Sequence, residues 1–464
     1  MAEDNLQRKL GLFPATNIVV ANMIGAGIFT TSGLLMAGLN NPLLMLALWV
    51  VGGVIALCGA LSYGELGAAM PGAGGEYLFL SKLYHPLFGF LSGWVSFVVG
   101  FSAPIAASAM GFSEYFCRAI PSIPGWFEST GIMNPEVTRT FLSVSVILIF
   151  TFIHYRGIKT GALIQNILTL LKVALIVFLL LAGFLSGKGD ISNFSTGGGV
   201  SSGFGGWKTI GLSLMWIMFA YSGWNASTYL GAEIKNPSKI LPRSLIAGTG
   251  IVMLLYLGLN VLYIYSINPD DMKGVISIGG LAMGNLFGKS AGILFSLLIA
   301  FALFSSLSAF IIIGPRVYYS MAKDGLFFKS VASIHPKFQV PSNSIVLQAV
   351  IAIVLTLSGT FEQILTYMGF ALGIFPILTV IGVLKLRKEQ PAAIRMAGFP
   401  FTQIIYVATG VGILVLAYLE RPVESSIALL TVITGIPAYY IFRIKNKGGP
   451  FTEPPFQITP KINP

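Results

Sequence analysis

Charge is what this sequence has least of. Asp, Glu, Lys and Arg together make up 10% of its 464 residues, whereas hydrophobic residues make up 55%. A soluble domain carries about a quarter charged residues, so this composition argues against a soluble fold and predicts a membrane protein. A transmembrane β-barrel is excluded too, because its strands alternate apolar and polar residues. The stretch LTLLKVALIVFLLLAGFL is instead apolar on every side apart from one lysine.

Cysteine and histidine are also scarce. Cys58 and Cys117 are the two cysteines, which is too few for a disulfide framework or a metal cluster. No cluster of His, Asp or Cys falls within the apolar runs to do acid, base or nucleophilic work, so we expect neither an enzyme nor a cofactor or metal site. The three histidines fall in predicted loops or at helix ends, where a solvated role is favoured: His85, His154 and His335.

A glycine-rich stretch, GAGG at 72–75, resembles a phosphate-binding loop only superficially. It lacks the Lys and the Ser or Thr that follow in such loops, and no strand precedes it. We predict a flexible cytoplasmic linker between the second and third spans, with Glu76 and Lys82 near its boundary.

The apolar runs are long enough to cross a bilayer twelve times. A hydrocarbon core about 30 Å thick needs roughly 20 apolar residues of helix. No Lys or Arg occurs between Lys9 and Lys82, or between Lys337 and Lys385, and each gap has room for two spans. Eight single spans fit elsewhere, at about 84–117, 139–155, 160–186, 208–232, 244–266, 290–314, 400–419 and 424–442.

These spans define the expected organisation of the chain. Residues 11–186 hold helices 1–5, residues 207–386 hold helices 6–10, and residues 399–443 hold helices 11 and 12. A cytoplasmic N-terminus at 1–10 and a proline-containing cytoplasmic tail at 444–464 flank them.

The net charge of +11 is a topology signal. With both termini on one side of the membrane, 20 of the 28 basic residues fall on that side and seven on the other, which leaves Lys172. Positively charged loops are retained in the cytoplasm. Both termini are therefore expected to be cytoplasmic in a multi-pass protein of the cell membrane, and no clustered basic footprint remains for nucleic acid.

Lys172 lies well inside the fifth span, in QNILTLLKVALIVF. An ammonium in the bilayer costs several kcal/mol on insertion scales. Lys172 could snorkel to the cytoplasmic boundary. Alternatively it faces the protein interior, paired with carbonyls or hydroxyls or carrying a titratable proton.

Two spans carry interruptions at matching places. Gly25, Ala26 and Gly27 interrupt the first, and Ser222 and Gly223 interrupt the sixth. Because an odd number of helices per repeat inverts the second copy, a separation of five spans is expected for two inverted repeats with a substrate site at the midplane. Small residues also pack helices against one another, so each interruption alone has that simpler explanation.

Broken helices expose main-chain groups that fit a zwitterion. Where the first helix resumes near Ile28, unpaired N–H groups and the helix dipole favour a carboxylate. Where the preceding halves end, near Ile24 and at 219–221, free carbonyls can accept hydrogen bonds from an ammonium. The backbone pattern thus predicts an amino acid as the substrate class.

These residues resemble the amino acid–polyamine–organocation superfamily of transporters, and within it the L-amino acid transporter-like branch. The resemblance rests on NMIGAGIFTTSG, on GELGAAMPGAGGEYLFL, on Lys172 and on FAYSGWNASTYLGAEIKNPSKILPRSL. It implies an all-α membrane fold of twelve helices, with a five-plus-five inverted repeat (LeuT-like) and discontinuous helices 1 and 6.

The resemblance also implies roles for individual residues. Phe219 matches an aromatic residue that closes over substrate, and Lys172 stands where sodium-coupled relatives hold an ion, which argues against sodium coupling. Ser305 and Ser306 are candidates to line the cavity near Lys172, although they also suit helix packing. The full set of expected substrate-binding residues is Ile24, Gly25, Ala26, Gly27, Ile28, Phe219, Ala220, Tyr221, Ser222, Gly223 and Asn225.

The expected function is alternating-access transport of neutral L-amino acids, by exchange or with protons. The substrate class follows from an apparent lack of carboxylates near either break, since Glu65 falls toward the cytoplasm and Glu114, Glu362 and Glu424 toward the outside. A channel or an amino acid receptor on the same scaffold is the alternative. No disulfide-linked subunit is expected, because the loop between spans three and four holds no cysteine unless Cys117 lies there.

Overall fold

The computed structural model describes Arg8 and residues 10–445, except residues 73, 132, 157, 196, 201, 202, 336, 339 and 390–393. Side chains are described for these residues apart from 158–166 and 316. The predicted N-terminal segment and tail therefore lie almost wholly outside the described residues. Within them the chain is helical, as predicted, and its one extended pairing is an isolated bridge between Leu10 and Ile234.

The helices follow one another in this order. The first half of the chain holds α1 (Leu12–Met23), α2 (Ala26–Leu39), α3 (Pro42–Ala69), α4 (Glu76–Leu83), α5 (Pro86–Val95), η1 (Ser96–Gly100), α6 (Ser102–Ala119), α7 (Ser122–Ser129), α8 (Pro135–Tyr155), α9 (Ile158–Leu185) and η2 (Ile191–Ser195). The second half holds α10 (Phe204–Ala220), η3 (Ala226–Tyr229), η4 (Gly231–Glu233), α11 (Pro237–Ser266), α12 (Pro269–Met272), α13 (Ile278–Phe287), α14 (Lys289–Lys323), η5 (Lys329–Ala332), α15 (Ser342–Ser358), α16 (Phe361–Glu389), α17 (Phe401–Glu420) and α18 (Pro422–Lys445).

Ten helical stretches in the described part of the chain are long and apolar enough to span a membrane. Helices α10 and α15 have 17 residues each, at the lower limit for a span. With these two, every predicted span has a helical counterpart, while the count of twelve and the inverted repeat stay predictions.

Proline after a polar cap starts several of these helices. Asn41 precedes Pro42 and accepts a hydrogen bond from the N–H of Leu44, which starts α3. Asn134 and Pro135 start α8 in the same way. The side chain at the cap satisfies an orphan N–H, and proline at the first helical position loses no bond there. His85, expected to be solvated, caps α5 in this way.

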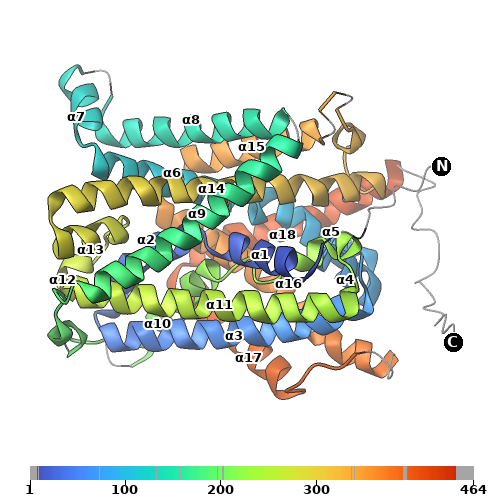
Figure 1. The fold of residues 1–464 in the computed structure, drawn as a ribbon. Coiled ribbons are helices and arrows are strands. Elements are labelled where there is room, and N and C mark those ends of the chain that lie inside the picture. The colour runs from blue at the N-terminus through green and yellow to red at the C-terminus, as the bar shows by residue number, and fades with distance from the viewer. Residues whose placement is uncertain are drawn as a thin grey trace.

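The broken helices lie inside the bundle (Figure 1). In the stretch that contains α1 and α2, 89% of the most apolar segment is buried, whereas the corresponding share is 22% for α17 and for α18. Helix α10 packs against α2, α17 and α16, and α1 packs against α11. The first and sixth spans are thus surrounded by the others, which is where an interrupted helix can be tolerated.

Both predicted interruptions are present. Helix α1 ends at Met23 and α2 begins at Ala26. Helix α10 ends at Ala220, and the turn beyond it contains Gly223 with φ 93°. A Cβ on Gly223 would lie 2.8 Å from the main-chain carbon of Asn22, so the turn requires glycine both for its conformation and for its packing against α1.

The structure adds three local features that the sequence did not predict. Beyond its predicted interruption the sixth span does not resume as an α-helix, because residues 226–233 form the 3₁₀ turns η3 and η4, with i to i+3 bonds such as Thr228 N–H to Asn225 O at 3.0 Å. The third span is interrupted by the π turn η1. The glycine-rich stretch at 72–75 leads directly into the helix α4, in which Glu76 is buried.

Candidate functional site

The start of α2 offers main-chain donors at the centre of the bundle. Ala26, Gly27 and Ile28 form its first turn, and no acceptor for their N–H groups is found in the described part of the chain. Gly25 precedes them in an extended conformation, with φ −125°. Because all four residues are buried, this turn presents unpaired donors and the positive end of a helix dipole in a site shielded from bulk water.

Lys172 lies beside this break and does not snorkel. Its side chain is fully buried, and its ammonium donates hydrogen bonds to the carbonyls of Ala21, at 3.1 Å, and Ile24. Ser306 Oγ lies 3.3 Å from the ammonium and itself donates to Ile24 O at 2.9 Å. The lysine therefore occupies carbonyls freed where α1 ends, and the prediction of an interior, paired lysine is confirmed.

Tyr256 of α11 joins the ends of the two broken helices. Its hydroxyl lies 2.6 Å from the carbonyl oxygen of Met23 and 3.0 Å from that of Ala220. These are the last residues of α1 and α10. Sequence reasoning missed Tyr256, because it lies on a helix with no break and nothing in its spacing marks it.

A small cavity adjoins the start of α2. It has a volume of about 10 Å³, which is room for one water molecule. Phe219 contributes to its wall, and the other lining residues are Asn22, Met23, Gly25, Ala26, Gly27, Pro104, Ser108, Ala220, Ser222 and Phe310.

A larger cavity of about 130 Å³ lies next to it. Four residues line both cavities: Asn22, Phe219, Ser222 and Phe310. Apolar groups from the third, sixth, eighth and tenth spans dominate the larger one, together with the main chain of the α10 break: Phe101, Met218, Phe310, Ile313, Leu372, Pro376, Ser222, Gly223 and Trp224. Ser96 and Gly100, the two ends of the π turn η1, also line this cavity.

The structure brings most of the expected site residues together, with exceptions. Ile24 and Ile28 line neither cavity, although their main-chain groups belong to the break. Tyr221 lines neither cavity, and its hydroxyl donates a hydrogen bond to the carbonyl of Trp49 at 3.1 Å. Ser305 also lines neither cavity, and its Oγ lies 3.3 Å from Oγ1 of Thr169. His154, expected in a solvated position, is buried against Ser308 at 2.9 Å.

The prediction that no carboxylate lies near the breaks was wrong. Glu76 lines the larger cavity, and its Oε1 accepts hydrogen bonds from Tyr63 and from Asn225, both at 2.8 Å. Asn225 lies two residues after Gly223 of the α10 break. Burial raises the pKa of Glu76, which lies between the second and third spans, to about 7, and its three hydrogen-bond donors oppose this rise. Sequence spacing could not show this contact, because it depends on how α4 folds back.

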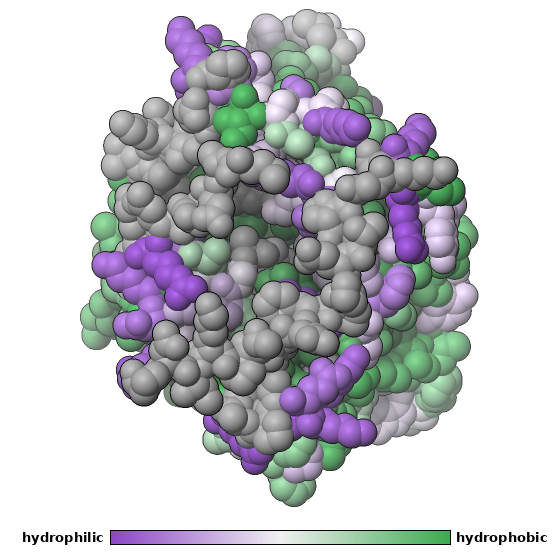
Figure 2. Space-filling view, turned by 90° about the vertical axis from the view of Figure 1, so that its right-hand side faces the viewer, coloured by the Kyte–Doolittle hydropathy of each residue, from purple (hydrophilic) through white to green (hydrophobic). Residues whose placement is uncertain are grey.

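The two ends of the bundle differ. We call the end with Glu76, where α18 also finishes, the α4 end, and the opposite end the α13 end (Figure 1). Figure 2 looks onto the α4 end. The larger cavity lies on this side of the break, since its lining includes Glu76, Tyr229 and Tyr406.

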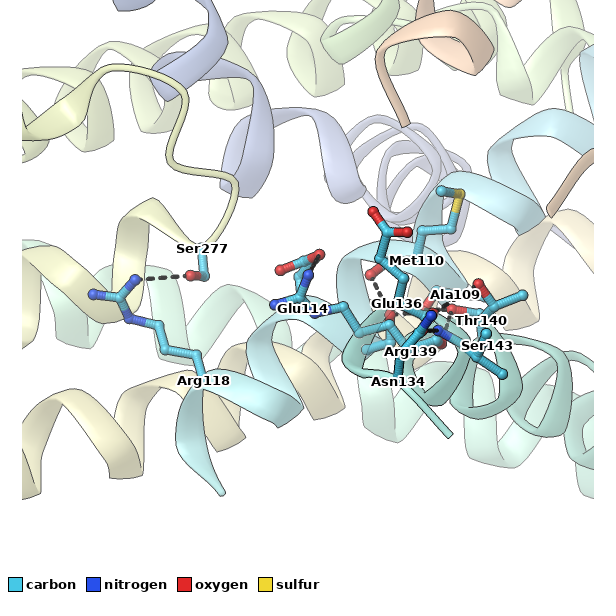
Figure 3. A network of polar contacts seen from close by, with 12 residues as sticks. Ala109, Met110, Glu114, Arg118, Asn134, Glu136, Arg139, Thr140, Ser143 and Ser277 are labelled. Atoms are coloured by element: carbon cyan, nitrogen blue, oxygen red, sulfur yellow. Dashed lines mark hydrogen bonds and ion pairs between the residues drawn. The ribbon is translucent and has the colours of Figure 1, made fainter. Parts of the chain in front are cut away.

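The α13 end is closed by direct contacts. Tyr115 of α6 donates a hydrogen bond to Phe29 O of α2 at 2.5 Å and accepts one from the N–H of Gly279 in α13 at 3.0 Å. A Cβ on Gly33 would lie 2.2 Å from the carbonyl oxygen of Val275. Arg118 donates to Ser277 at 3.0 Å, as Figure 3 shows.

Comparison with known proteins gives a consistent result. Residues 10–437 match the family described as amino acid permease. The chain is 28% identical to the serine/threonine exchanger SteT of Bacillus subtilis (strain 168), over 94% of this chain and 98% of that protein. It is 26% identical to the mouse (Mus musculus) b(0,+)-type amino acid transporter 1, over 94% of this chain and 88% of that protein. It is 27% identical to the human (Homo sapiens) large neutral amino acids transporter small subunit 2, over 94% of this chain and 80% of that protein.

Proposed function

The chain belongs to the amino acid permease family, and from this premise we propose that it carries neutral L-amino acids across the cell membrane by sodium-independent alternating access. Its family and its relatives are transporters, not enzymes, and amino acid transport is its general function. The observation that carries the finer proposal is the unpaired first turn of α2, which lies next to a cavity and to the buried Lys172.

The first turn of α2 binds the substrate carboxylate in this proposal. The N–H groups of Ala26, Gly27 and Ile28 lack acceptors among the described residues, and a carboxylate satisfies several such donors at once. The small cavity must widen from about 10 Å³ to admit it. Movement of Phe219, which belongs to both walls, joins the two cavities.

The substrate ammonium binds at the carbonyls of the broken ends. Met23 and Ala220 both line the small cavity, and their carbonyls share the one hydroxyl of Tyr256. A carbonyl oxygen has two lone pairs, so each can accept a further donor. Lys172 and Ser306 hold the neighbouring carbonyl of Ile24 from the other side.

The substrate side chain enters the larger cavity. Its wall is mainly apolar, with Phe101, Met218, Phe310 and Leu372 among the lining residues, and such a wall favours side chains without charge. The proposal of a neutral substrate therefore depends on this lining, and no longer on the absence of a carboxylate, since Glu76 is present.

In this proposal, transport is independent of sodium because of where the Lys172 ammonium lies. Its ammonium already occupies the carbonyls of Ala21 and Ile24, which are oxygen ligands that a sodium ion would require. A second cation beside a fixed one is repelled. We propose exchange as the mode of transport, because the serine/threonine exchanger SteT is similar over nearly its whole length.

Both termini are cytoplasmic in this proposal, because 20 of the 28 basic residues fall on that side of the predicted topology. The larger cavity then faces the cytoplasm and the contacts of Tyr115 close the outside. The described conformation is thus one end state of an alternating-access cycle.

Reconstitution into liposomes tests the proposal. Uptake of labelled L-serine should saturate, and unlabelled L-serine or another neutral amino acid inside the vesicles should stimulate it. A panel of unlabelled amino acids then ranks the substrates by competition, with neutral ones expected to compete most strongly. Ohmic current without saturation would favour a channel, and saturable binding without uptake would favour a receptor.

A further inference from the structure

Glu76 forms a second polar centre at the α4 end of the larger cavity. It begins α4 and is 7% exposed. Tyr63 of α3, Ser92 of α5 and Asn225 of the α10 break all donate hydrogen bonds to it, at 2.8, 3.4 and 2.8 Å. These donors come from three spans, so the carboxyl group ties α4 to the broken helix.

The two oxygens of Glu76 are not equivalent. Oε1 accepts the two short bonds, from Tyr63 and Asn225, whereas Oε2 accepts only the long bond from Ser92. A contact of 3.4 Å is weak for an O–H donor. Oε2 therefore keeps room for a proton, and the carboxyl group borders the cavity through which water can deliver one.

No cation compensates this carboxyl group in the described part of the chain, since no Lys, Arg or His lies within ion-pair distance of it. The titratable groups that face it are the phenols of Tyr63, Tyr229 and Tyr406, and the polar groups are Asn225 and Ser92. All are neutral near pH 7. Burial without a counter-charge disfavours the ionised form, which agrees with the pKa of about 7 for this group.

Protonation of Glu76 changes its hold on Asn225. A hydrogen bond to a carboxylate is about twice as strong as one between neutral groups. While Glu76 is ionised, the amide of Asn225 is held toward α4 by the 2.8 Å bond. When Glu76 is neutral, this bond weakens and the amide becomes free to turn toward the cavity that Asn225 also lines.

We propose that Glu76 is a proton-binding site of the transport cycle, and that its protonation releases the amide of Asn225 for the substrate. The inference rests on the proposed function, because it requires an amino acid in the larger cavity. A proton passes from water in the cavity onto Oε2, no other bond is made or broken, and the reverse step returns it to the same water.

The test measures binding of labelled L-serine to the purified protein between pH 6 and 8. Wild-type affinity should fall by about fivefold across this range, because a charge-assisted bond competes for Asn225 when Glu76 is ionised. Glu76→Gln removes the titration and keeps the shape, so its affinity should stay near the wild-type value at pH 6 throughout.

Asp324→Asn is the matched control. Asp324 also accepts a hydrogen bond from a tyrosine of α4, Tyr77, at 2.6 Å, and burial raises its pKa too. It lines neither cavity, so this variant should keep the wild-type pH dependence.

Tyr63→Phe provides an independent variant. Because it removes a donor that stabilises the ionised form of Glu76, the midpoint of the pH dependence should move to higher pH. Infrared difference spectra between pH 6 and 8 should also show a protonated carboxyl band that is lost in Glu76→Gln.

The outcomes separate the two proposals. If the wild type shows neither saturable binding nor uptake, the proposed function fails. If the wild type binds and transports but Glu76→Gln keeps its pH dependence, the proton site is wrong while the transport proposal stands. An unmoved midpoint in Tyr63→Phe would likewise overturn the proton site.

Discussion

Gly27 of α2 lies against Ala220 of α10 so closely that a Cβ on the glycine would be 2.5 Å from the Cα of Ala220. The two broken helices thus touch through main-chain atoms beside the proposed carboxylate site. Such an approach leaves no side chain that could rotate away to relieve a clash.

Replacement of Gly27 with alanine should therefore strongly reduce transport. The added methyl forces α2 and α10 apart, and overpacking of this kind costs about 1–3 kcal/mol. We expect uptake of labelled L-serine to fall more than about tenfold, since the donors of α2 lose their position. Gly25→Ala is the control, because its Cβ would lie 3.6 Å from Ser306 Oγ, an ordinary contact. Equal losses in both variants would contradict the close-approach argument.

Lys172 should be required for transport as well as for order at the break. Lys172→Met keeps most of the volume but leaves the carbonyls of Ala21 and Ile24 without their charged donor. Each lost bond to a charged group is worth about 1.5–3 kcal/mol, so uptake should fall at least about tenfold. Ser306→Ala, which removes only the neutral donor to Ile24, should have a smaller effect. If Lys172→Met kept wild-type uptake, the lysine would serve only to occupy volume in the core.

Sodium should have no effect on uptake by the wild type. When choline replaces sodium in the outer buffer, the initial rate and the half-saturating concentration should stay the same, because Lys172 already fills the carbonyl site. The comparison needs equal ionic strength, since surface charge effects vary with salt. A steep dependence on sodium concentration would refute this assignment.

Stability of the α4 end should depend on the ion pair between Glu65 and Arg387. Arg387 donates to both carboxylate oxygens, at 2.6 and 2.7 Å, and Glu65 is fully buried. Arg387→Ala leaves that charge unpaired, which should lower the free energy of unfolding by about 3–5 kcal/mol. Thermal unfolding in detergent measures the loss.

Lys208→Ala serves as the comparison for this pair. Lys208 and Glu420 lie 3.0 Å apart with both side chains 29% exposed, and such a pair contributes about 0–1 kcal/mol. If Arg387→Ala were no less stable than Lys208→Ala, the buried pair would have no special structural role.

The main features of the site could be predicted from the sequence because each has a local cause. The glycines in GAG weaken the helix that contains them, and a lysine within an apolar run must find partners. The breaks at Gly25 and Gly223 and the burial of Lys172 follow from these rules.

Other features depend on contacts between distant segments. Tyr256 reaches the α1 break because α11 packs on α1. Glu76 reaches the α10 break because α4 packs against α5 and α16 at the end of the bundle. Helices that are apolar on all sides give no preferred rotation, so the sequence could not show which side chains face inward. The π turn η1 is similarly hidden in a run that has no proline between residues 87 and 103.

Tyr256 carries a single phenolic hydrogen, yet two carbonyl oxygens lie within its reach. At any instant one of them receives that hydrogen and the other goes without. The two carbonyls are thus short of one hydrogen, and in the proposed function the substrate ammonium, which has three, supplies it. The hydrogen bond of Tyr256 therefore alternates between the ends of α1 and α10, and the proposed substrate would let both helix ends be satisfied at once.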